Sequence, residues 1–139
     1  MKKRVIALCI VISVFCLVAC GQEKTAKPYM GGHFMGDKKQ TVESRGNAEE
    51  VLGIPVYHWI YLYTTEEVLK GVIYEAGEEY SLEEVVEVFE GTYGEGTKGF
   101  RGENQEYTEY SWVDEDSIIY VMKKNDEGNV IIQISGLAQ

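Results

Sequence analysis

Few side chains in this sequence have the type and spacing that catalysis requires. His58 lies in an apolar run typical of a packed strand, and His33 lies in a polar stretch with no second metal ligand beside it, which predicts a solvated ring. Adjacent carboxylates such as Glu83 and Glu84 fall on a predicted wet surface, where nothing would raise a carboxyl pKa for acid–base work. The hydroxyl of Ser81 is expected to cap a helix. The sequence therefore predicts that the protein is not an enzyme and has no cofactor and no metal site.

The cysteines offer a different chemistry. Cys9 and Cys16 lie in an apolar run over residues 5–19 that follows a basic start. A basic start, an apolar run of this length and a small residue at its end are typical of a secretory signal peptide. We therefore predict that residues 1–19 are removed and that Cys20 is the one cysteine of the mature chain. Without a second thiol, no disulfide is expected.

The end of this run, Leu17-Val18-Ala19-Cys20, resembles the lipobox of bacterial lipoproteins. The resemblance implies export, transfer of a diacylglyceryl group to the Cys20 thiol, and cleavage just before that residue. Two or more acyl chains on one residue hold a protein durably on a bilayer. We expect a lipid-anchored protein of the cell membrane or outer membrane whose domain faces the extracytoplasmic side. The alternative is an ordinary secretory signal with an incidental cysteine.

Charge is distributed unevenly along the mature chain. Between residues 20 and 45, five basic residues oppose three acidic ones, a net charge of +2. From residue 46 onward, five basic residues oppose twenty acidic ones, a net charge of −15. The first segment is therefore compatible with an anionic lipid surface, whereas the second would be repelled by it. Nucleic acid is excluded as a partner, since it requires a basic surface.

Composition predicts three parts of the chain. After the signal peptide over residues 1–19, residues 20–46 are rich in Gly, Lys, Gln, Thr and Ser without apolar periodicity, which predicts a flexible tether. Residues 47–139 have the length and apolar content of a single domain with its own core. We expect this α+β domain to be a monomer.

The first half of the domain begins with a predicted strand over residues 56–63. Alternation places Tyr57, Trp59, Tyr61 and Tyr63 on one face of that strand. For residues 64–76 two structures compete. Capping-box spacing at the start and an apolar stripe at helical spacing favour a helix, and the rival is a β-hairpin that turns at residues 64–67.

The second half combines one well-marked helix with three strands. Ser81 and Glu84 have capping-box spacing, and Leu82, Val85 and Phe89 belong to an apolar stripe that predicts a helix ending at Gly91. A polar, glycine-rich loop is expected over residues 92–106. The expected strands, joined as an antiparallel meander, cover residues 106–113, 117–123 and 130–135.

This pattern resembles the small bacterial lipoproteins whose domain has the beta-lactamase inhibitory protein-like fold, including the SmpA/OmlA type. The resemblance covers about residues 65–137 and rests on these motifs: the Leu82-to-Gly91 helix with Gly94 and Gly96, Tyr110-x-Trp112, the Met122-to-Val130 hairpin and Gly136-Leu137. Residues 47–63 have no counterpart in it. It implies a two-helix pair packed on one face of a small antiparallel sheet, with the other face open to a protein partner.

The residues that this open face would carry cannot be fixed from alternation alone. Either Ile119 with Val121, or Ile118 with Tyr120 and Met122, would be exposed. Large aromatic residues are enriched at protein interfaces, so the candidate binding face comprises Trp59, Tyr61, Tyr110, Trp112 and Tyr120. The expected function is a protein-binding or assembly module of the cell envelope. The alternative is an inhibitor or sensor that captures a secreted enzyme or small ligand through its acidic surface.

Overall fold

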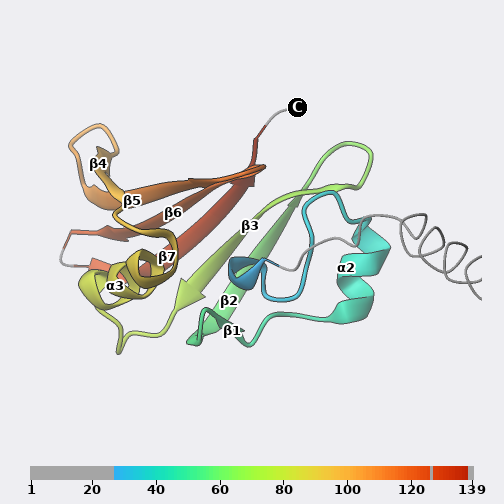
Figure 1. The fold of residues 1–139 in the computed structure, drawn as a ribbon, viewed down its shortest axis with the longest axis horizontal. Coiled ribbons are helices and arrows are strands. Elements are labelled where there is room, and N and C mark those ends of the chain that lie inside the picture. The colour runs from blue at the N-terminus through green and yellow to red at the C-terminus, as the bar shows by residue number, and fades with distance from the viewer. Residues whose placement is uncertain (1–26, 126, 138–139) are drawn as a thin grey trace, which may run out of the picture.

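The computed structural model describes residues 27–125 and 127–137. The predicted signal peptide, the lipobox and Cys20 lie outside the described residues. The described chain forms one antiparallel sheet of seven strands in the order β1-β2-β3-β7-β6-β5-β4 (Figure 1). The strands are β1 (Glu50–Val51), β2 (Ile54–Tyr63), β3 (Leu69–Ala76), β4 (Thr97–Arg101), β5 (Tyr107–Asp114), β6 (Ser117–Lys124) and β7 (Glu127–Gly136).

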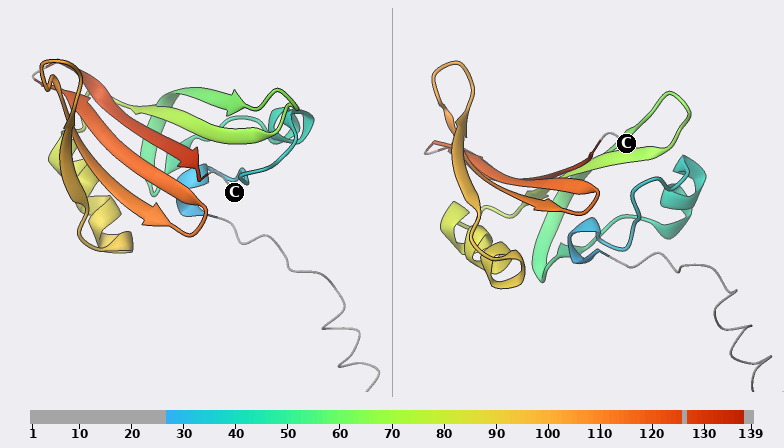
Figure 2. Two further views of the ribbon diagram at one scale, coloured as in Figure 1. Left: turned by 90° about the horizontal axis from the view of Figure 1, so that it is seen from above. Right: turned by 45° about the horizontal axis from the view of Figure 1, so that its top comes forward.

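Three helical elements accompany this sheet in the described residues. They are the 3₁₀-helix η1 (Pro28–Met30) and the α-helices α2 (Lys39–Arg45) and α3 (Leu82–Tyr93). Figure 2 shows that α3 and the N-terminal elements lie on the same side of the sheet. In the described chain nothing covers the opposite side, which we call the open face.

The expected fold class is wrong, because residues 64–76 form a strand and not a helix. The Thr64 hydroxyl accepts the backbone N–H groups of Glu66 and Val68, so it closes the turn between β2 and β3 and caps no helix. Along β3 the buried Val72 and Tyr74 alternate with partly exposed residues, the period of a strand. The described chain therefore holds no helix pair on a small sheet, and the rival hairpin interpretation is confirmed.

Helix α3 confirms the prediction made from its sequence. The Ser81 side chain accepts the backbone N–H of Glu84, and the Glu84 carboxylate accepts that of Ser81, which completes the capping box. The apolar stripe of Leu82, Val85, Val86 and Phe89 is buried against the sheet. The helix continues past Gly91 to Tyr93, and the loop expected after it contains the edge strand β4.

The core lies between the sheet and the elements on its helical side. Register places Ile119 of β6 opposite Ile134 of β7, and Ile134 opposite Val72 of β3, and all three are fully buried. Burial of a contiguous aliphatic surface of this kind is the main driving force of folding. The sheet is therefore organised about one covered face and one open face.

The N-terminal segment, residues 27–49, packs on the sheet. Tyr29 and Met30 are buried in the core, and Gly36 and Lys39 donate backbone hydrogen bonds to Leu69 and Glu67 at the start of β3. A flexible tether was expected over residues 20–46. From Lys27 onward this prediction is wrong, because the segment is packed on the sheet. Close approach requires a glycine here, because a Cβ on Gly31 would lie 2.3 Å from the Ala48 Cβ.

None of the helices in the described part of the chain is both long enough and apolar enough to cross a membrane.

Candidate functional site

A groove runs along β2 where this strand faces the second half of the N-terminal segment. Two adjoining cavities make it, and Asn47 lines both. The first has a volume of about 410 Å³ and is lined by Tyr57, Trp59 and Glu49 among others. The second has a volume of about 390 Å³, and its lining includes Tyr61, Tyr63 and Glu43. We call the two together the β2 groove.

The aromatic wall of the β2 groove follows from the period of a strand. Alternate side chains of a strand share one face and recur about every 6.6–6.8 Å, so Trp59, Tyr61 and Tyr63 lie in a line. All three are half-buried, and they pack against the core cluster. A bulge between Val56 and His58 shifts the register of β2 against β3 at the end of this line. Tyr57, in the bulge, is 55% exposed and its hydroxyl contacts Glu79.

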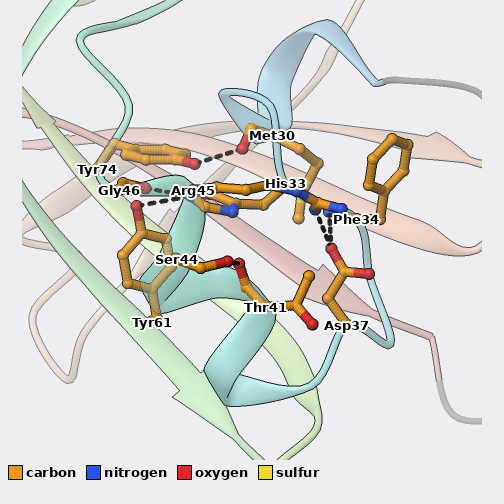
Figure 3. Close-up of polar contacts among 10 residues, drawn as sticks. All are labelled: Met30, His33, Phe34, Asp37, Thr41, Ser44, Arg45, Gly46, Tyr61 and Tyr74. Carbon is orange, nitrogen blue, oxygen red and sulfur yellow. Dashed lines mark hydrogen bonds and ion pairs between the residues drawn. The ribbon is translucent and has the colours of Figure 1, made fainter.

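His33 stands behind the groove and joins both of its walls (Figure 3). Its Nε2 lies 2.8 Å from the Gly46 carbonyl oxygen and 3.2 Å from the Tyr61 hydroxyl. A carbonyl oxygen only accepts, so we assign the proton to Nε2. The ring is 2% exposed and packs edge-on against Tyr61, with 5.0 Å between ring centroids. The solvated ring expected from the sequence is therefore wrong.

Burial lowers the pKa of His33 because a charged ring would lose its hydration. The nearby Arg45 acts in the same direction, and the Gly46 carbonyl and Asp37 oppose it. With Nε2 as the donor, the buried Nδ1 has no hydrogen-bond partner. His33 thus holds the groove together as a neutral ring at pH 7.

Further polar contacts fix the N-terminal segment at the back of the groove. Buried Asp37 accepts hydrogen bonds from the Phe34 backbone and the Arg45 guanidinium. The Tyr74 hydroxyl donates to the Met30 carbonyl oxygen at 2.8 Å. Figure 3 shows these contacts converging from the N-terminal segment, α2 and the sheet. These contacts hold the N-terminal segment against the sheet behind the groove.

The beginning of the described chain is fixed at the turn between β5 and β6. The Lys27 ammonium lies 3.2 Å from Asp114 and 3.0 Å from Glu115, and the Tyr29 hydroxyl donates to Asp114 at 2.7 Å. Burial disfavours ionisation of Asp114, but the hydrogen bonds from Tyr29 and Lys27 outweigh it and hold its pKa below the usual value. These contacts hold the first described residues at this corner of the domain.

The structure does not gather the five aromatic residues of the expected binding face. Trp59 and Tyr61 line the β2 groove. Trp112 is 5% exposed, packs on Phe89 and donates its indole N–H to the Gly94 carbonyl oxygen at 2.9 Å. Tyr110 shares that covered face, and only Tyr120 lies on the open face.

The open face carries apolar side chains on β2, β3 and β6, and β7 lies between β3 and β6. Register places Ile60 opposite Ile73, and the same face of β6 carries Ile118, Tyr120 and Met122, of which Met122 is only 4% exposed. Ile60 is 58% exposed, and Ile73 and Ile118 are half-buried. The sequence did not decide which alternating set of β6 residues would be exposed. The structure places Ile119 and Val121 in the core.

Charged residues on the open face are paired with one another. Arg101 Nε lies 2.9 Å from the Glu109 carboxylate, and its guanidinium covers the Tyr120 ring, with 4.7 Å from the guanidinium carbon to the ring centroid. His58 was expected to be packed, which is wrong, because its side chain is 77% exposed with Nδ1 3.4 Å from the Glu75 carboxylate. The face thus combines aliphatic side chains with charges that already have partners.

The polar wall of the β2 groove was not expected from the sequence. This wall is formed by Glu43, Asn47 and Glu49. They lie in or next to the segment that was expected to be a flexible tether, and its composition does not indicate a binding site. The aromatic alternation over residues 57–63 was the available signal, and it marks the other wall. Among the described residues, no group of three or more His, Cys, Asp or Glu side chains could hold a metal ion.

Comparison with known proteins adds no relative from which a role could be transferred. No protein-family model matches the chain, and neither a curated protein nor a solved structure shows significant similarity to it.

Proposed function

We propose that this chain is a membrane-anchored lipoprotein of the cell envelope, without a catalytic role, that binds another envelope protein through the open face of its sheet. The open face supports the binding role: its aliphatic residues have no covering element in the described chain. Unpartnered apolar surfaces of this kind mark interaction sites. The lipobox resemblance at Cys20 supports the anchor.

The pairing of charges on this face indicates the chemistry of the partner. Arg101 and Glu109 neutralise each other, as do Lys124 and Glu127, whose atoms lie 3.3 Å apart. The face therefore offers an apolar surface with few free charges, and we commit to a partner protein with an apolar contact surface. Such a contact is insensitive to salt, whereas capture through the acidic surface would weaken as salt rises.

The start of the described chain lies at one corner of the domain, where Lys27 meets Asp114 and Glu115 at the turn between β5 and β6. Five basic residues oppose twenty acidic ones from residue 46 onward, so anionic headgroups would repel the domain. This repulsion supports a partner that meets the domain in solution beside the membrane.

The binding role is tested by photo-crosslinking in intact cells. A benzoylphenylalanine at Ile60 or Ile118 on the open face is compared with one at Val88, which is 37% exposed on α3. We expect one adduct of the same mass from both open-face positions and none from Val88. The partner is then purified, and Ile60→Asp should weaken direct binding about tenfold or more at both low and high salt.

Three results would overturn the binding role. Adducts of equal yield from Val88 would show that the contact is not specific to the open face. Adducts with the mass of two copies would indicate self-association, and binding that disappears in high salt would favour capture through the acidic surface.

The anchor is tested separately with Cys20→Ala. We expect wild-type protein to incorporate labelled fatty acid and to sediment with membranes, and the variant to lose both properties. Labelling of the variant, or release of the wild type by high salt, would contradict the anchor.

A further inference from the structure

We propose that the β2 groove is a binding site for a neutral glycan in extended conformation. This site lies on the covered side of the sheet and is independent of the protein contact proposed for the open face. Its lining combines a line of aromatic rings with amide and carboxylate groups on the facing wall. A sugar ring has an apolar face of C–H groups and a rim of hydroxyls, which matches those two walls.

The arrangement of the rings selects an extended ligand. Trp59, Tyr61 and Tyr63 are alternate residues of one strand, so their side chains stand side by side at intervals of about 6.6–6.8 Å. A compact cation such as a quaternary ammonium is bound by rings that converge around it. A line of rings instead offers successive stacking surfaces to a chain of repeating units.

The facing wall selects a ligand that donates hydrogen bonds. Glu43 and Glu49 carboxylates accept only, and the Asn47 amide both donates and accepts. Backbone groups of Glu43 and Glu49 make hydrogen bonds, but the three side chains make no hydrogen bond or ion pair with another described residue. These three side chains are exposed, so the hydroxyls of a bound glycan would replace water as the donors to the carboxylates. A polyproline peptide, also extended, has no N–H groups to offer them.

The charge of the groove excludes anionic ligands. Two carboxylates line it, and neither of its cavities is lined by a lysine, arginine or histidine. The Lys39 ammonium lies 5.9 Å from the Tyr63 ring centroid, and Glu67 pairs with this ammonium at 3.7 Å. The surrounding domain is also strongly acidic, with a net charge of −15 from residue 46 onward because five basic residues oppose twenty acidic ones. Phosphorylated or uronic-acid polymers would be repelled. A neutral glycan is the ligand that satisfies stacking, hydrogen bonding and charge together.

The two tryptophans of the chain make a direct test possible. Trp59 lines the groove, whereas Trp112 is 5% exposed and packed on Phe89. Full-length acylated protein, in a detergent without a sugar headgroup, is titrated with cellotetraose, chitotetraose and maltotetraose while its fluorescence is recorded. We expect at least one tetrasaccharide to shift the emission and to saturate with a dissociation constant of about 1 mM or below.

Variants assign the signal to the groove. Trp59→Phe should abolish the spectral change, and Trp112→Phe should keep it. Asn47→Ala should weaken binding several-fold with an unchanged unfolding midpoint, and Tyr120→Phe on the open face is the matched control that should bind like wild type.

The proposal is overturned if none of the three tetrasaccharides changes the emission, or if the change survives Trp59→Phe. Saturable binding of decaproline or choline chloride at the same tryptophan, without binding of any glycan, would also overturn it. Neither result bears on the open face, because crosslinking at Ile60 is measured on the opposite side of the sheet.

Discussion

The two faces of β2 carry side chains of similar character but have different surroundings. Trp59 and Tyr61 are half-buried beside the N-terminal segment, whereas Ile60 between them is 58% exposed on the open face. The difference arises from residues 27–49 and α3, which both pack on one side of the sheet (Figure 2). Hydrophobicity along a strand thus marks both faces as apolar, and the position of distant segments decides which one is covered.

The largest effect should distinguish neighbouring residues of β7. Ile132 is fully buried in the core, and Ile131 points to the open face. We expect Ile132→Ala to lower the free energy of unfolding by about 2–5 kcal/mol, because it leaves a cavity. Ile131→Ala should cost about 1 kcal/mol or less. Urea unfolding measures both, and equal losses would mean that the open face is covered in the folded protein.

A somewhat smaller effect is expected where the N-terminal segment meets the sheet. Tyr74→Phe removes the hydroxyl that donates to the buried Met30 carbonyl oxygen. An unpaired buried carbonyl costs about 1–3 kcal/mol, which urea unfolding would measure. Tyr120→Phe on the open face is the matched control and should change little. If Tyr74→Phe also changed little, the segment would not be held to the sheet through this contact.

His33 should make stability depend on pH. Burial lowers its pKa from the ordinary value of 6.5 in the folded state, so the unfolded chain binds the proton more readily. The contribution of the neutral His33 ring to the free energy of unfolding is therefore fully present above about pH 6.5. It decreases as the pH falls below that value. Unfolding free energies measured at pH 7.5 and 5.5 should differ by less in His33→Gln than in wild type. An equal difference in His33→Gln would show that another group causes the pH dependence.

The smallest effect should come from the open face itself. Ile60→Thr keeps a β-branched side chain on an exposed position of β2 and should change the unfolding free energy by no more than about 0.5 kcal/mol. Thermal unfolding with the same protein concentration provides the measurement. A loss above about 1 kcal/mol would show that another part of the chain, or a second copy, packs on this residue.

Local sequence signals were sufficient to predict helix α3, but they were not sufficient to predict strand β3. The capping box of Ser81 and Glu84 involves only neighbouring residues, so the sequence predicts it directly. Residues 69–76 have a pattern that fits one face of a helix and also alternates as a strand. Pairing with β2 and β7 decides between them, and those partners are distant in the sequence. The helix prediction failed because it weighed only local spacing.

The packing of the N-terminal segment was missed for a related reason. Its glycines and polar residues are typical of a linker, yet Gly31 permits the close approach to Ala48 that lets Tyr29 and Met30 enter the core. His33 was expected in solvent, and its partners Gly46 and Tyr61 lie 13 and 28 positions along the chain. Strand β4 was missed because it is short, polar and at the sheet edge.

The sequence by itself determined the elements whose causes are local: the capped helix α3, the aromatic alternation of β2, the strands after residue 106, and the lipobox pattern that predicts an anchor at Cys20. The tertiary structure alone decided that residues 69–76 are a strand and that residues 27–46 are part of the fold. It also placed Tyr120 and Trp112 on opposite faces. The physical reason is that burial depends on long-range packing, which residue spacing within one segment does not encode.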